Sequence, residues 1–139
     1  MSDKPQDPYR IVVGFDGSEG AKRALTWAAD EARLHSGHLR AVCAWTPGEF
    51  GGDEEQAAIA QKRVEDGVAE VLGQKPGVEV ETISERGHAA KVLLDNSKDA
   101  QMLVIGSRGH GGFTGLLLGS VGQNVASHGE TPVVVIVRR

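Results

Sequence analysis

The sequence predicts one α/β domain, an open doubly wound sheet of five mainly parallel strands with four helices, in the strand order 3-2-1-4-5. Short apolar runs rich in Val and Ile alternate along the chain with segments whose apolar residues recur at helical spacing. Parallel strands need crossover connections, so this alternation indicates a sheet covered by helices on both faces. The length of 139 residues suits a single domain.

Five short segments are expected to form the strands. The first ends at Asp16, and the third alternates apolar and polar residues, which indicates one exposed face and a place nearer an edge of the sheet. Thr131 and Pro132 introduce the last. The expected strands are residues 10–15, 39–45, 78–84, 101–105 and 133–137.

Start and stop signals mark the first two of the four expected helices. Ser18 can cap the free amides at the start of the first helix, and Gly37 sits where that helix should stop. The acidic residues 53–55 suit the N-terminus of the second. The expected helices lie between Ser18 and Gly37, from residue 53 to about 73, and over residues 88–98 and 120–128.

Composition narrows the classes of function. The formal charge of -4 gives no net positive field for nucleic acid or an anionic membrane. The longest purely apolar run, residues 133–137, cannot span a bilayer, and the start of the chain lacks the apolar core of a signal peptide, so we expect a cytoplasmic protein. Cys43 is the single cysteine and is interpreted as a reduced, buried thiol. Residues 1–8 are expected to be a flexible N-terminus, and residues 9–139 the domain.

The glycine-rich segment from Gly106 to Ser120 has the properties of a phosphate site. In a doubly wound sheet, ligands bind outside the carboxyl ends of the strands where the winding reverses, which singles out the turns at Asp16 and Gly106. Glycines let backbone amides approach an anion, and Gly119 and Ser120 add a helix N-terminus. A Walker loop is excluded because Gly111 is not followed by Lys and Ser or Thr, and no dinucleotide fingerprint follows the first strand.

The glycine spacing matches a known pattern: Gly, two residues, Gly, nine residues, Gly, then Ser or Thr. Gly106, Gly109, Gly119 and Ser120 meet it. With the opening run of residues 11–18 and the closing run of residues 131–137, the chain resembles the universal stress protein family over nearly its whole length. The resemblance implies a Rossmann-like fold of the adenine nucleotide alpha hydrolase type, in the branch of the family that keeps the glycine pattern and binds ATP.

The resemblance also implies a set of site residues. The glycine pattern would hold the phosphates of ATP, Asp16 would lie by the ribose and by a Mg²⁺ or Mn²⁺ ion, reached through water, and Ala44 would line the adenine opposite Ile105. No residue is expected to bind the metal directly or to be catalytic. The predicted ATP-binding residues are Phe15, Asp16, Ala44, Ile105, Gly106, Arg108, Gly109, Gly119, Ser120 and Val121. One departure is Gln101, where the family often has Asp, at a position that faces away from this site.

Several of these residues also have an ordinary structural interpretation. In this interpretation, the carboxylate of Asp16 merely bonds local amides in a turn that starts a helix, and Arg108 is a solvated surface charge. His110 and His88 are interpreted as a loop residue and a helix-start residue near the pocket rim, without a nucleophile or metal partner. Trp45 either borders the base or fills a strand end. Phe113 and Leu116 to Leu118 are expected to be packing anchors or a lid.

Three hypotheses of function follow. The favoured one is a regulatory stress-response module in which bound ATP orders residues 106–120 and changes what the surface offers a protein partner. A cyclic nucleotide or another adenine ligand is a variant of it. The second is a slow ATP hydrolase, for which the sequence offers Arg108 and a metal but no base. The third is a nucleotide-independent scaffold that dimerises through residues 133–137, since an apolar edge strand needs covering. Homodimers of this kind are typical of the family.

Overall fold

The computed structural model describes residues 8–47, 52–107 and 131–137, and the structural statements below concern these residues. They form one five-stranded sheet in the order β3-β2-β1-β4-β5, and all neighbouring strands pair in parallel, as predicted. The strands are β1 (Arg10–Gly14), β2 (His38–Trp45), β3 (Glu79–Arg86), β4 (Met102–Gly106) and β5 (Val133–Ile136). The helices are α1 (Glu19–Leu34), α2 (Asp53–Leu72) and α3 (Ala89–Asn96).

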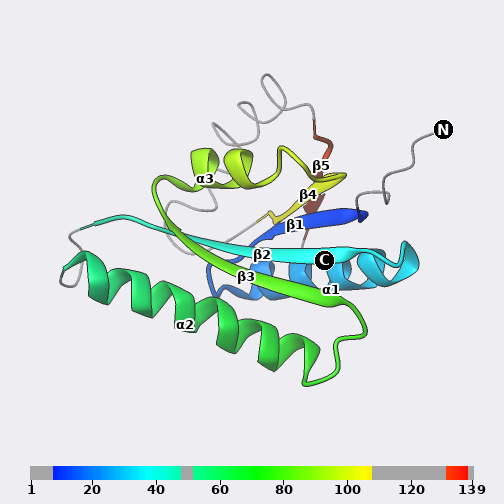
Figure 1. The fold of residues 1–139 in the computed structure, drawn as a ribbon, viewed down its shortest axis with the longest axis horizontal. Helices are drawn as coiled ribbons and strands as arrows, with labels where there is room; N and C mark the ends of the chain where they lie inside the picture. The colour runs from blue at the N-terminus through cyan, green and yellow to red at the C-terminus, as the bar shows by residue number, and fades with distance from the viewer. Residues whose placement is uncertain (1–7, 48–51, 108–130, 138–139) are drawn as a thin grey trace.

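Helices cover both faces of the sheet, which confirms the doubly wound prediction. Figure 1 shows α1 and α2 below the sheet and α3 above it. Alternate residues of β1 point to the two faces of the sheet. Ile11 and Val13 pack in the core between the sheet and helices α1 and α2, whereas Val12 packs in the smaller core between the sheet and α3. All three side chains have no exposed surface. Burial of these two cores supplies the main driving force for folding.

The boundaries of the elements differ slightly from the expected ones. β3 begins one residue later and ends two residues later than predicted, since its pairing with β2 continues to Trp45 and Arg86. Within the described residues there are three helices. The expected fourth helix, residues 120–128, lies outside them.

The connection from α1 to β2 shows why Gly37 is a glycine. The helix ends at Leu34, and the left-handed residue after it is Ser36, with a φ of 52°. Gly37 has no room for a Cβ because the carbonyl of Tyr9 occupies that space. The same carbonyl accepts a hydrogen bond of 2.7 Å from the amide of His38. Gly37 therefore allows the start of β2 to approach the residue before β1, rather than forming the left-handed cap.

Candidate functional site

The winding of the sheet reverses between β1 and β4, so their carboxyl ends define the expected ligand edge. Gly106, the last residue of β4, packs against the first turn of α1, and a Cβ placed there would lie 2.7 Å from the carbonyl oxygen of Gly20. Ser107 follows, buried, and its amide donates a 2.9 Å hydrogen bond to the carbonyl of Ile136. The start of the glycine-rich segment thus lies directly beside the N-terminus of α1.

On the α3 side of the sheet, a position without a side chain lies between Val42 and Ile105. Gly14 pairs with Val42 of β2, and the register of β1 with β4 continues to place Gly14 next to Ile105. Ile105 is fully buried, and Ala44 packs partly buried against the same core. Ala44 and Ile105 therefore share one face, on either side of β1, as the predicted adenine site requires. Gly14 itself contributes no side chain to this face of β1.

Phe15 belongs to the other side of the sheet. Its ring is 1% exposed and packs against Gly67 of α2, where a Cβ would overlap the ring. Its amide donates a 2.8 Å hydrogen bond to the carbonyl of Val42. Among the predicted ATP-binding residues, Phe15 is thus a core residue whose side chain anchors α2. Only its main chain lies along the turn that leads to Asp16.

The turn after β1 is organised by its own polar groups. Asp16 Oδ1 accepts a 3.0 Å hydrogen bond from the amide of Ser18, and Ser18 Oγ accepts a 3.1 Å bond from the amide of Ala21. Ser18 is the N-cap of α1, as predicted. Gly17 between them has a φ of +86°, which favours glycine. The carboxylate is therefore presented at the positive end of a helix dipole, at the carboxyl edge of the sheet.

Cys43 lies near this turn, on the face toward α1 and α2. It is 1% exposed, which confirms the expected burial. Burial raises the pKa of the Cys43 thiol to about 11, and the charge of Asp16 acts in the same direction, while Arg63 opposes both through its charge and a hydrogen bond. A thiol in this state is a packing group rather than a nucleophile.

Arg63 is a residue at this edge that the sequence analysis missed. It is exposed on α2, and its side chain lies along Gly17. Helical spacing carried a usable signal, because Arg63 stands four residues before Gly67 and beside the buried Val64. A single arginine on an amphipathic helix nevertheless gives no sign of which neighbour it reaches.

A groove of about 410 Å³ runs between α1 and α2 beside this turn. It lies on the side of the sheet away from Ala44 and Ile105. Its lysines already have partners, since Lys22 pairs with Glu70 at 2.8 Å and Lys62 pairs with Asp66 at 2.9 Å. Of the three cations that line the groove, the two lysines are thus neutralised by carboxylates of α2, and Arg63 is the third. Its lining residues are Phe15, Gly17, Lys22, Ile59, Lys62, Arg63, Asp66, Gly67 and Glu70.

The other residues considered at the sequence level fall into three groups. Trp45 packs toward α1 and α2, on the face opposite Ala44, which matches its interpretation as a filler. His88 is the exposed N-cap of α3, and Gln101 lies at the amino end of the sheet, where its Oε1 accepts from the amide of Arg10. The rest lie outside the described residues: Arg108, Gly109, His110, Phe113, Leu116 to Leu118, Gly119, Ser120 and Val121.

The described part of the chain holds no cluster of three or more His, Cys, Asp or Glu residues arranged to bind a metal ion. In the same residues, no helix is both long and apolar enough to cross a membrane. The site offers backbone amides, small residues and the Asp16 carboxylate.

Comparison with known proteins gives a consistent result. The model of the universal stress protein family matches residues 9–137. A universal stress protein of Mycolicibacterium smegmatis is 36% identical over 140 residues, covering 92% of this chain and 48% of that protein. One from Mycobacterium tuberculosis is 37% identical over 130 residues, covering 90% of the chain and 44% of its own length. The chain spans about half the length of the curated relatives it matches.

A solved structure carries the comparison to a bound ligand. The universal stress protein from Archaeoglobus fulgidus in complex with dAMP is 28% identical, with a TM-score of 0.68, over 92% of this chain and 97% of that one. The match of the family model, the identity to curated relatives and the shared fold agree, and the chain belongs to the universal stress protein family.

Proposed function

We propose that the chain binds an adenine nucleotide, ATP with Mg²⁺ or Mn²⁺, at the carboxyl ends of β1, β2 and β4, as a regulatory module of the stress response in the cytoplasm. The observation that carries the proposal is the junction at Gly106. The strand that leads into the glycine-rich segment ends against the N-terminus of α1, at the same edge of the sheet as Gly14 and Asp16.

Two structural neighbours support the choice of ligand. One is the Archaeoglobus fulgidus protein in complex with dAMP. The other is a universal stress protein in complex with cAMP, 26% identical with a TM-score of 0.67, over 95% of this chain and 98% of that one. Both ligands are adenine nucleotides with a single phosphate. In this chain Ala44 and Ile105 would border the base, and residues Gly106, Arg108, Gly109, Gly119, Ser120 and Val121 would hold a longer polyphosphate.

The residues present suit a metal that arrives with the nucleotide. Mg²⁺ usually keeps several waters and takes one or two carboxylates together with substrate phosphates. Asp16 is the carboxylate at this edge, with one oxygen already bonded to the amide of Ser18. It would contact the ion through water, while the phosphates would supply the remaining charge. The metal would neutralise the polyphosphate, and Asp16 would orient the hydrated ion.

Mass spectrometry of the ligand released from freshly purified protein tests the proposal, followed by calorimetric titration with ATP and Mg²⁺. We expect an adenine nucleotide to be released and the emptied protein to bind ATP. A protein that releases no nucleotide, and whose melting temperature does not move with ATP, GTP or cAMP, would contradict it. Release of cAMP or AMP in place of ATP would retain the site and change the natural ligand.

We also propose that β5 pairs with a second copy of the chain to form a homodimer. β5 is an edge strand that pairs with β4, and Val135 within it is 39% exposed, while Val137 just after it is 62% exposed. An apolar edge of this kind favours pairing with another strand. Analytical ultracentrifugation should give a dimer for the wild type and a monomer for Val135→Lys. A wild-type monomer at micromolar concentration would rule the dimer out.

A further inference from the structure

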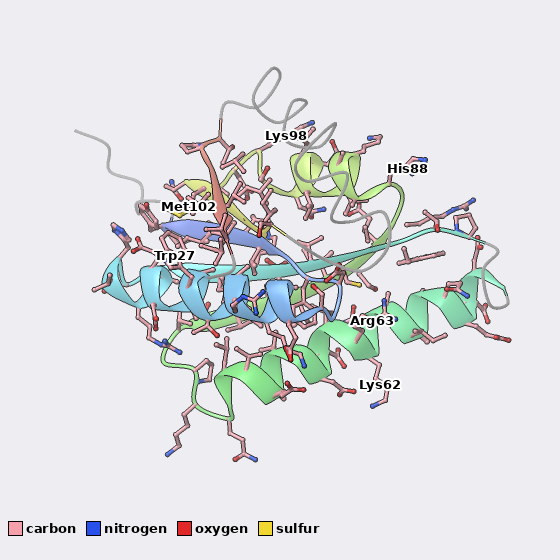
Figure 2. All side chains as sticks on the ribbon, turned by 180° about the vertical axis from the view of Figure 1, so that it is seen from behind. Trp27, Lys62, Arg63, His88, Lys98 and Met102 are labelled. Carbon is pink, nitrogen blue, oxygen red and sulfur yellow. The ribbon has the colours of Figure 1, made fainter. Side chains whose placement is uncertain are left out.

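The side chain of Arg63 crosses from α2 to the turn that follows β1. A Cβ placed on Gly17 would lie 3.3 Å from Cδ of Arg63 and 3.7 Å from its Nε. The aliphatic stem and the first nitrogen of the guanidinium therefore pack along the residue that directly follows Asp16. Figure 2 shows Arg63 on the side of α2 toward α1, while Lys62 extends away from the molecule.

The position of Arg63 is set by a contact one turn further along α2, between Gly67 and Phe15. The Phe15 ring fills the space above Gly67, so that no side chain is possible there. Val64 is fully buried in the same core. Residues four apart share one face of a helix, so the contact of Gly67 with Phe15 brings Arg63 onto Gly17. The residues on both sides of Asp16 are thus in contact with α2.

The charges of Arg63 and Asp16 both act on the thiol of Cys43. Cys43 responds to both groups: after burial, which raises its pKa most, the charge of Arg63 lowers that pKa and the charge of Asp16 raises it. Both charges therefore act on one sulfur at the end of β2. A cation near a carboxylate reduces the repulsion that the carboxylate exerts on an anionic ligand.

We propose that Arg63 is a positioning residue of the nucleotide site, which holds the turn at Asp16 and Gly17 against α2 and offsets the charge of Asp16 beside the polyphosphate. The inference rests on the proposed nucleotide function and adds a residue of α2 to it. Lys62 offers a matched control, because it is the neighbouring cation, is exposed, and pairs with Asp66 at 2.9 Å.

Calorimetric titrations of the full chain with ATP and Mg²⁺, and with adenosine, test this role. Arg63→Gln should weaken ATP binding about tenfold and adenosine binding less than about threefold, because adenosine carries no charge. Arg63→Lys should retain most of the affinity, and Lys62→Gln should change it less than about twofold. In an Asp16→Asn background, Arg63→Gln should have less than about a twofold effect, since the two residues act together.

The outcomes separate this inference from the proposal beneath it. If Arg63→Gln weakens ATP binding equally with and without Asp16, or weakens adenosine binding as much as ATP binding, Arg63 is not acting through Asp16. An equal effect of Lys62→Gln would also overturn the inference while leaving the nucleotide site standing. If the wild type binds neither ATP nor adenosine, both proposals fail together. Should Arg63→Gln not fold, Arg63→Met compared with Arg63→Lys gives the same test.

Discussion

The amino and carboxyl ends of the sheet differ in the contacts that their side chains make. At the amino end, long charged side chains bond to one another: Arg40 pairs with Glu81 at 2.8 Å and with Asp99 at 3.0 Å, and Arg10 pairs with Asp99 at 2.7 Å. At the carboxyl end, Gly106 meets the first turn of α1 backbone to backbone, an approach that Gly37 also makes to Tyr9 at the amino end. At the amino end the charged side chains have protein partners, whereas the carboxyl end presents the Asp16 carboxylate and backbone groups. Stability and binding are expected to separate along this line.

The tight backbone approach at the carboxyl end should give the largest of the predicted effects. Gly106→Ala places a Cβ about 2.7 Å from the carbonyl oxygen of Gly20, which cannot rotate away. We expect the free energy of unfolding to fall by about 3 kcal/mol, the upper end of overpacking costs. Urea denaturation measures the change. Gly52→Ala is the control, since no atom lies within 4 Å of its added Cβ, and it should cost less than about 1 kcal/mol. Equal costs at both glycines would contradict the tight junction.

Arg40 should contribute most of the stability that the charged side chains give to the amino end of the sheet. Its side chain is 14% exposed and also donates a 2.7 Å hydrogen bond to the carbonyl of Asn96. Arg40→Met keeps the stem but removes these bonds, and should lower the free energy of unfolding by about 1–2 kcal/mol. ATP affinity should stay within about twofold of the wild type. A loss of affinity without a loss of stability would break the separation of the two ends.

Low pH should weaken the ion pairs at the amino end, because it protonates Asp99. Partial burial tends to raise the pKa of its carboxyl, but the hydrogen bond and charge of Arg40, with the charge of Arg10, outweigh it and lower the pKa below 3.8. A lowered pKa in the folded state gives stability that is present above the unfolded value and is lost as the pH falls through the folded value. The difference in melting temperature between wild type and Asp99→Asn should therefore shrink below about pH 4. A difference that stays constant from pH 6 to pH 2 would contradict the ion pairs.

The smallest expected effect is that of bound nucleotide on the reactivity of Cys43, which lies near the ligand edge but on the face toward α1 and α2. With its pKa raised to about 11, the thiol should react with a disulfide reagent at pH 8 only when the chain unfolds. Bound nucleotide should slow that reaction only through added stability. Rapid labelling of the folded protein would show that this edge opens locally.

The sequence allowed the architecture to be predicted because its signals are local. Runs of Val and Ile, the Ser18 cap and the alternation in β3 report on their own segments, and strict alternation of elements then limits the topology. The carboxyl-end junction could also be expected from the place of Asp16 and Gly106 in chain order.

Contacts between distant segments could not be predicted in the same way. Phe15 was assigned to the ligand, yet its ring packs on Gly67, more than 50 residues away. Gly37 was correctly assigned to a helix end, where its amide bonds to the carbonyl of Ala32, but the sequence did not show that the carbonyl of Tyr9 excludes a side chain there. Helical spacing put Arg63 on the same face of α2 as Gly67, but only the packing of α2 shows that it reaches Gly17. In each case the partner is set by tertiary packing, which spacing along the chain does not encode.

The most direct test makes the same substitution at both ends and measures both properties. Asp16→Asn and Asp99→Asn each remove one carboxylate charge from the chain. We predict that Asp16→Asn weakens ATP binding at least about tenfold and changes the melting temperature little, whereas Asp99→Asn lowers the melting temperature and leaves ATP affinity within about twofold. If Asp16→Asn binds ATP as the wild type does, or if Asp99→Asn is the variant that loses it, the carboxyl end of the sheet is not the nucleotide site.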